Sequence, residues 1–176
     1  NADSFHLLDP QLRHALQDFN SSPFLRLIEQ ISGIDGLIPD PYVTGGGMHQ
    51  ILRGGILDVH TDFNYYERTK SYRVLNVLIY LTSRWEAGFG GELEFWNASP
   101  LEGGTAVKHV PPLFNRAVIF RTDKKSFHGH TNQWRAPDSV TRRSIALYYY
   151  TSQPIDGGLY DQNTDFMNVV SRDLLL

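Results

Sequence analysis

From Pro39 to Thr151 the chain consists of short extended segments that are separated by glycine-rich turns. Gly, Pro, Thr, Val, Ile and aromatic residues dominate this part, and helical periodicity fades. The pattern predicts strands at about 47–53, 56–60, 72–82, 91–96, 105–110, 116–121 and 142–151. Many short strands joined by glycine turns are typical of a β-sandwich or a barrel. No internal repeat, low-complexity segment or linker interrupts the series.

The segment before Pro39 predicts two helices within residues 9–33. Asp9-Pro10 and Ser22-Pro23 each resemble a helix start, and Gly33 is a suitable stop. Apolar residues follow at helical spacing in both segments: Leu12, Ala15, Leu16 and Phe19, then Phe24, Leu27, Ile28 and Ile31. We expect the two helices to cover one face of a sheet and to have a packing role only.

Length and charge define the class of protein. The chain has 176 residues, which predicts a single domain over residues 1–176 with a substantial core. The net charge of −3 argues against a general nucleic-acid binder. No apolar run approaches the roughly 18 residues of a membrane span, so no membrane partner is expected. The sequence does not indicate an oligomeric state.

The chain contains no cysteine, which excludes disulfides, thiolate metal sites and cysteine nucleophiles. No signal peptide is visible, and we therefore expect a cytoplasmic location. Asn1 is not an initiator methionine, so a trimmed chain or a piece of a longer protein is also considered. The tail from Asp156 to Leu176 has no clear pattern, and Leu174–Leu176 is expected to pack back on the domain.

His60-Thr61-Asp62 places an imidazole and a carboxylate two residues apart on a predicted strand. Side chains of a strand alternate with period 2, so His60 and Asp62 point to the same side. A further imidazole would complete two histidines and one carboxylate on one face of a metal, a set that suits non-haem Fe(II). His128 and His130, in Lys125–Thr131, are the best placed of the remaining histidines, at a strand end or in a loop.

The predicted strand 142–151 has two unlike faces. Ile145, Leu147 and Tyr149 share one face with Arg143 and suit packing under helices. On the other face Arg142 is followed by small residues, which leaves room for a ligand. The guanidinium of Arg142 can bind a carboxylate through two hydrogen bonds, and Ser144 can add a hydroxyl. An arginine pair at a solvated strand end is the structural alternative.

Four segments in this order resemble the prolyl-4-hydroxylase-type branch of the 2-oxoglutarate- and Fe(II)-dependent dioxygenases: His60–Asp62, Gly90–Trp96, Phe127–His130 and Arg142–Leu147. The resemblance covers about residues 46–151. It implies a mostly β protein with flanking helices, in which a double-stranded β-helix (jelly-roll) core holds a metal between its two sheets. It also implies that His60, Asp62 and His128 are the metal ligands.

The resemblance further implies a cosubstrate pocket. Arg142 matches the basic residue that binds the distal carboxylate of 2-oxoglutarate, with Arg143 as the second candidate, and Tyr80 matches a tyrosine that hydrogen-bonds the same group. The positions that line this pocket in relatives are occupied here by Asn76, Leu93 and Gln50. His130 stands where the family often has an aliphatic residue, and it stays open as an alternative ligand or a substrate contact.

The implied function is hydroxylation of an unactivated C–H bond in a prolyl, peptide or amino-acid-like substrate. Fe(II), 2-oxoglutarate and O2 are the implied cofactor and cosubstrates, with ascorbate as a candidate supporting factor. Halogenating relatives replace the carboxylate ligand by a small residue, so Asp62 favours hydroxylation.

Two other classes are considered. One is a cupin-like jelly-roll protein that binds a metal through His60, Asp62, His128 and His130 and does not use 2-oxoglutarate. The other is a non-catalytic binding module.

Overall fold

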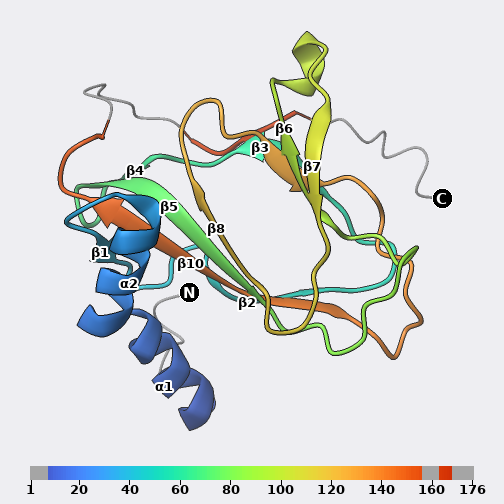
Figure 1. Cartoon of the computed structure of the whole chain (residues 1–176), viewed down its shortest axis with the longest axis horizontal. Helices are drawn as coiled ribbons and strands as arrows, with labels where there is room; N and C mark the ends of the chain where they lie inside the picture. The colour runs from blue at the N-terminus through green and yellow to red at the C-terminus, as the bar shows by residue number, and fades with distance from the viewer. Residues whose placement is uncertain (1–7, 156–162, 168–176) are drawn as a thin grey trace.

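The computed structural model describes residues 8–155 and 163–167, which form two β-sheets with two helices on the outer side of one of them (Figure 1). Within these residues, one sheet contains β1 (Ile38–Pro39), β2 (Gly47–Ile51), β4 (Tyr65–Tyr66), β5 (Ser71–Tyr80), β8 (Ala117–Arg121) and β10 (Arg142–Thr151). The other contains β3 (Leu57–Thr61), β6 (Leu93–Trp96), β7 (Ala106–Val110), β9 (His128–His130) and β11 (Asp165–Phe166). A 3₁₀ turn, η2 (Pro100–Glu102), connects β6 and β7.

The strands pair antiparallel, and the chain passes repeatedly between the two sheets, as in a jelly roll. The long strands β5 and β10 lie side by side in the middle of the larger sheet. In the smaller sheet β9 lies between β3 and β6. This confirms the expected mostly β fold with flanking helices.

Each predicted strand is present, with ends that shift by up to two residues. The strands β1, β4, β9 and β11 were not predicted, because two or three residues are too short to show an alternating pattern. The prediction of a strand end or loop for Lys125–Thr131 was therefore wrong in part, since His128–His130 is paired on both sides.

The helices begin and end close to the expected signals. Helix α1 (Pro10–Phe19) is capped by Asp9, whose side chain accepts a hydrogen bond of 2.9 Å from the backbone N–H of Gln11. Helix α2 (Ser22–Ser32) ends at Gly33, which adopts a φ of 68°. A left-handed conformation costs glycine little and most other residues more, which explains why the helix stops here.

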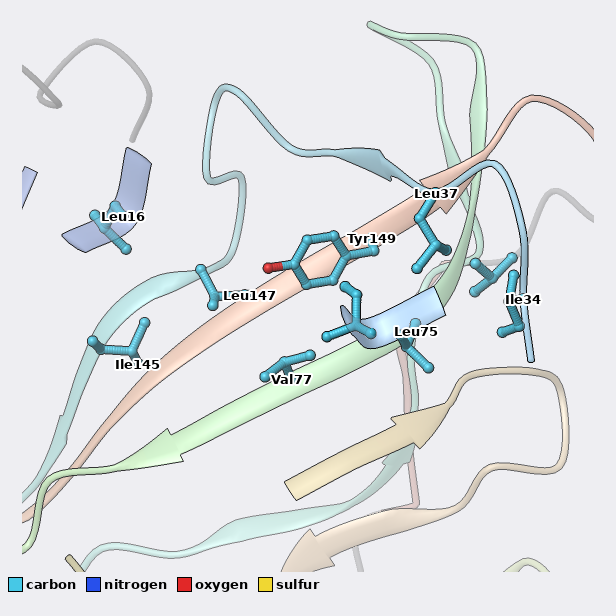
Figure 2. Packing of buried hydrophobic residues seen from close by; sticks show 10 residues of the cluster. Leu16, Ile34, Leu37, Leu75, Val77, Ile145, Leu147 and Tyr149 are labelled. Atoms are coloured by element: carbon cyan, nitrogen blue, oxygen red, sulfur yellow. The ribbon is translucent and has the colours of Figure 1, made fainter. Parts of the chain in front are cut away.

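The apolar core lies between these helices and the larger sheet (Figure 2). Its buried members come from both helices, the segment after α2, and strands β5 and β10: Leu16, Ile28, Ile34, Leu37, Val74, Leu75, Val77, Ile145, Leu147 and Tyr149. The helices therefore cover one sheet face, as expected. The predicted stripe of α2 was wrong at Leu27 and Ile31, which are 49% and 58% exposed, because Ile28 and its neighbours Phe24 and Leu25 form the packed side.

The described part of the tail pairs with the smaller sheet. Strand β11 lies beside β3, and Met167 is buried, with its sulfur accepting a hydrogen bond from the Ser99 hydroxyl. Leu174–Leu176, which were expected to pack on the domain, lie outside the described residues. Among the helices that the structure describes, none has the length and apolar character needed to cross a membrane.

Candidate metal centre

Two histidines and one aspartate meet at the inner side of the smaller sheet. His60 on β3 and His128 on β9 are direct partners in the strand register, and their ring centroids are 4.4 Å apart. Asp62 follows immediately after β3. One potential ligand atom from each of the three side chains lies within 4.8 Å of the others, and all three residues are buried. The structure therefore brings together the three residues that the sequence selected, and they fit the donor set of a non-haem iron site.

Hydrogen bonds to the backbone orient both imidazoles. The Nδ1 atom of His60 lies 2.9 Å from the carbonyl oxygen of Asp58, and Nδ1 of His128 lies 2.7 Å from that of Ser126. A carbonyl oxygen only accepts, so Nδ1 carries the proton in both rings. Each Nε2 is then unprotonated and lies near Asp62, 3.7 Å from Oδ1 for His60 and 3.4 Å from Oδ2 for His128. Burial lowers the pKa of His128 to about 4, although Asp62 opposes this, so the ring is neutral near pH 7, as metal ligation requires.

Residues of the opposite sheet hold the Asp62 carboxylate. Its Oδ2 atom accepts hydrogen bonds from Arg73 Nη2 at 2.9 Å and from Asn76 Nδ2 at 2.8 Å. Arg73 Nε also donates to Asn76 Oδ1 at 2.9 Å, so the two donors support each other. Burial opposes ionisation of Asp62, but the charge of Arg73 and the hydrogen bond from Asn76 keep its pKa below the usual range. The carboxylate is thus charged, and its Oδ1 is the atom next to His60.

Sequence reasoning missed Arg73, because strict alternation places it with Leu75 and Val77 on the face that the helices cover. A β-bulge changes this. Tyr149 pairs with Leu75 whereas Tyr150 pairs with Arg73, so Val74 is an extra residue in β5. The bulge turns both Val74 and Leu75 toward the core and returns Arg73 to the side of the metal centre. No alternation signal could have indicated it.

Two aromatic rings enclose the Arg73 guanidinium. Its Cζ atom lies 3.4 Å from the ring centroid of Tyr148 and 4.8 Å from that of Phe63. Such cation–π contacts restrain the side chain, which is 3% exposed. Arg73 is therefore a fixed donor to Asp62.

We expect Arg73→Met to weaken Zn(II) or Mn(II) binding by about 10- to 100-fold, the usual effect of removing a hydrogen-bond partner of a metal ligand. The hydrogen bond from Asn76 to Asp62 remains in this variant, but a neutral amide cannot balance the negative charge of the carboxylate. Competition with a chromophoric chelator measures the affinity, and Arg84→Met, an exposed arginine, is the matched control. Unchanged affinity in folded Arg73→Met protein would show that the Asp62 contact has no role in metal binding.

Across the interior from these ligands, Arg142 is buried and Arg143 is exposed. Arg142 Nε donates to the carbonyl oxygen of Gly91 at 2.7 Å, and Nη2 lies 3.5 Å from the hydroxyl of Tyr80. Gly91 adopts a φ of 70°, and a Cβ there would lie 3.0 Å from Arg142 Cδ. The close approach needs glycine. Ser144 is buried and pairs with Tyr80 on the neighbouring strand. Arg142, Ser144 and Tyr80 therefore line one inner surface.

The other predicted pocket residues differ in placement. Leu93 is buried on β6, two residues before Phe95, the register partner of His128. Asn76 contacts Asp62. The placement of Gln50 was wrong: it pairs with Arg143 on the outer face, is exposed, and donates to the Thr141 hydroxyl at 3.0 Å. A shift of one residue along a strand reverses the face, which explains the error.

His130 does not join the metal ligands. The group of residues able to hold an ion comprises His60, Asp62 and His128, among the residues that the structure describes. The cupin-like interpretation required His130 as a fourth ligand and therefore loses its basis. Gly129 separates the two histidines of β9, and a Cβ at this position would lie 2.8 Å from the carbonyl oxygen of Leu57. The tight packing of β9 on β3 thus depends on glycine.

Comparisons with known proteins identify the family and support the fold. The model of the 2OG-Fe(II) oxygenase superfamily matches residues 46–150. A structure of prolyl 4-hydroxylases from Phytophthora capsici is similar at a TM-score of 0.58 and 19% identity, covering 86% of this chain. The chain spans 47% of the length of that protein. A Pseudomonas putida prolyl-4-hydroxylase gives a TM-score of 0.43 at 14% identity, with 85% of this chain and 80% of that chain covered. No curated protein matches the sequence.

Proposed function

This chain belongs to the 2OG-Fe(II) oxygenase superfamily, whose cofactor and cosubstrate are Fe(II) and 2-oxoglutarate, and we propose that it hydroxylates an unactivated C–H bond. The observation that carries the proposal is the buried set of His60, Asp62 and His128, which faces a buried Arg142. The overall reaction converts 2-oxoglutarate, O2 and R–H into succinate, CO2 and R–OH. Bound Fe(II) supplies the oxidising chemistry, and the protein supplies position and charge.

The described side chains have separate roles in this proposal. His60, Asp62 and His128 would hold the metal, a donor set that suits non-haem Fe(II) and leaves room for cosubstrate. Arg142, with Tyr80 and Ser144, binds the distal carboxylate of 2-oxoglutarate. Arg73 and Asn76 orient Asp62 through its Oδ2 atom. Because both sheets contribute to the site, we propose that they form one catalytic domain.

For the substrate, we propose a prolyl residue, a peptide or an amino-acid-like metabolite. The support is the resemblance of the motifs to the prolyl-4-hydroxylase branch, together with the Phytophthora structure of the same fold.

The test is turnover of 2-oxoglutarate. Protein loaded with Fe(II) is expected to release succinate in air, and release should increase when the substrate is present. Proline, prolyl peptides and a pool of amino-acid metabolites are screened for stimulation and for a product that has gained one oxygen atom. Stimulation by a metabolite without amino-acid character alone would refute the substrate class. Absence of anaerobic 2-oxoglutarate binding would refute the proposed function as a whole.

A further inference from the structure

His130 is a buried histidine without a hydrogen-bond partner. Its side chain is 1% exposed, and neither Nδ1 nor Nε2 has a partner within the described part of the chain. A buried polar group in this state costs stability, and such groups in native proteins call for an explanation. The ring lies on β9, two residues after His128, so it points to the same inner side as the metal ligand.

The electrostatic surroundings locate His130 along the interior. Burial and then the charges of Arg142 and His60 lower the pKa of His130. His128, by contrast, is affected by Asp62, His60 and Arg73. The strand register places His130 toward Arg142: β6 runs antiparallel to β9 with Phe95 opposite His128, so Gly91, whose carbonyl oxygen binds Arg142 Nε, lies beyond the His130 end of β9.

Its distance from the metal centre suits a dicarboxylate. Two residues along a strand correspond to about 7 Å, which is comparable with the separation of the carboxylates in an extended five-carbon diacid. A cosubstrate whose 2-oxo acid end lies beside His128 would bring its other carboxylate beside His130 and Arg142. Arg142 donates Nε to Gly91 and keeps its two terminal nitrogens for a carboxylate, so His130 would add a donor to those of Arg142 and Tyr80.

We propose that His130 donates a hydrogen bond to the distal carboxylate of the 2-oxo acid beside Arg142, and so contributes to the selection of a dicarboxylic cosubstrate. This inference rests on the proposed function. An imidazole carries at least one N–H in either protonation state, and a carboxylate oxygen can accept a hydrogen bond from it. His130 is thus a donor without a partner among the described residues, and the cosubstrate carboxylate would supply that partner.

The experiment is a double comparison by anaerobic calorimetry on protein loaded with Mn(II). The ligands are 2-oxoglutarate and 2-oxopentanoate, which lacks the distal carboxylate. The proteins are wild type, His130→Leu, His130→Gln and, as matched control, His109→Leu, which changes an exposed histidine of the same sheet. We expect His130→Leu to weaken 2-oxoglutarate binding by roughly 10- to 100-fold, the range for a hydrogen bond to a charged group, and to leave 2-oxopentanoate binding unchanged.

Two further readouts separate binding from structure. His130→Gln keeps an N–H donor and should recover part of the lost affinity. His130→Leu without cosubstrate should melt at a higher temperature than wild type, because it removes a buried unpaired polar group. A lower melting temperature combined with equal losses for both ligands would assign His130 a structural role and overturn the inference.

The outcomes also distinguish this inference from the proposed function. Wild-type protein that binds 2-oxoglutarate while His130→Leu binds it equally well would refute only the role of His130. Wild-type protein that binds neither 2-oxo acid after Mn(II) loading would refute both.

Discussion

Asp62→Ala is expected to abolish turnover, with metal affinity reduced by at least about 100-fold, beyond the effect of losing a supporting contact. The substitution removes the only carboxylate of the described ligand group. It also leaves Arg73 buried without its charged partner, which destabilises a protein by about 3–5 kcal/mol. Metal titration, succinate release and urea unfolding of the same preparation measure the three effects.

The loss of stability caused by the unpaired Arg73 needs its own control, because an Asp62→Ala protein that is partly unfolded would also lose its metal. Asp62→Ala combined with Arg73→Met removes both charges, and it should regain stability but not metal binding. Asp138→Ala, in an exposed loop, controls for loss of an aspartate in general. Full activity of folded Asp62→Ala protein would refute the assignment of the metal ligands.

Arg142→Ala is expected to weaken 2-oxoglutarate binding by roughly 2–5 kcal/mol, the cost of removing one partner of a buried charge pair. Since about 1.4 kcal/mol is a factor of ten in Kd, the loss exceeds tenfold. The guanidinium is buried, fixed by Gly91 and close to Tyr80. Anaerobic calorimetry with Mn(II)-loaded protein gives the affinity without turnover.

The adjacent arginine is the matched control. Arg143 is exposed on the opposite face of β10, and its Nε donates to the Thr141 hydroxyl at 2.8 Å. Arg143→Ala should change 2-oxoglutarate affinity by less than a factor of about three, as is usual for surface substitutions. The reverse order of the two effects would mean that the anchor is Arg143.

Most of the fold followed from local patterns. Alternation and glycine turns identified the long strands, and the same alternation separated Arg142 from Arg143 on β10, as the structure shows. The order of the motifs selected His60, Asp62 and His128, which the fold brings together although 68 residues separate the first and last. These features are visible because each depends on one strand or on the order of segments.

The rest depends on relations between strands. The placement of Gln50 failed because the register of β2 against β10 is set by pairing, and one residue of shift reverses the face. The contacts of Asn76 with Asp62 depend on how the two sheets approach each other, which no single segment encodes. The missing partners of His130 could be recognised only once its burial was known.

The extra residue in β5 has a consequence for comparing this chain with its relatives. Val74 shifts the alternation of the strand by one residue. Arg73 and Leu75 are two residues apart and would normally share a face, but they lie on opposite faces here. In a relative whose strand lacked the extra residue, alignment by residue count alone would match Arg73 to a core position. Positions before and after Val74 should therefore be aligned separately, with strand pairing rather than residue count as the guide.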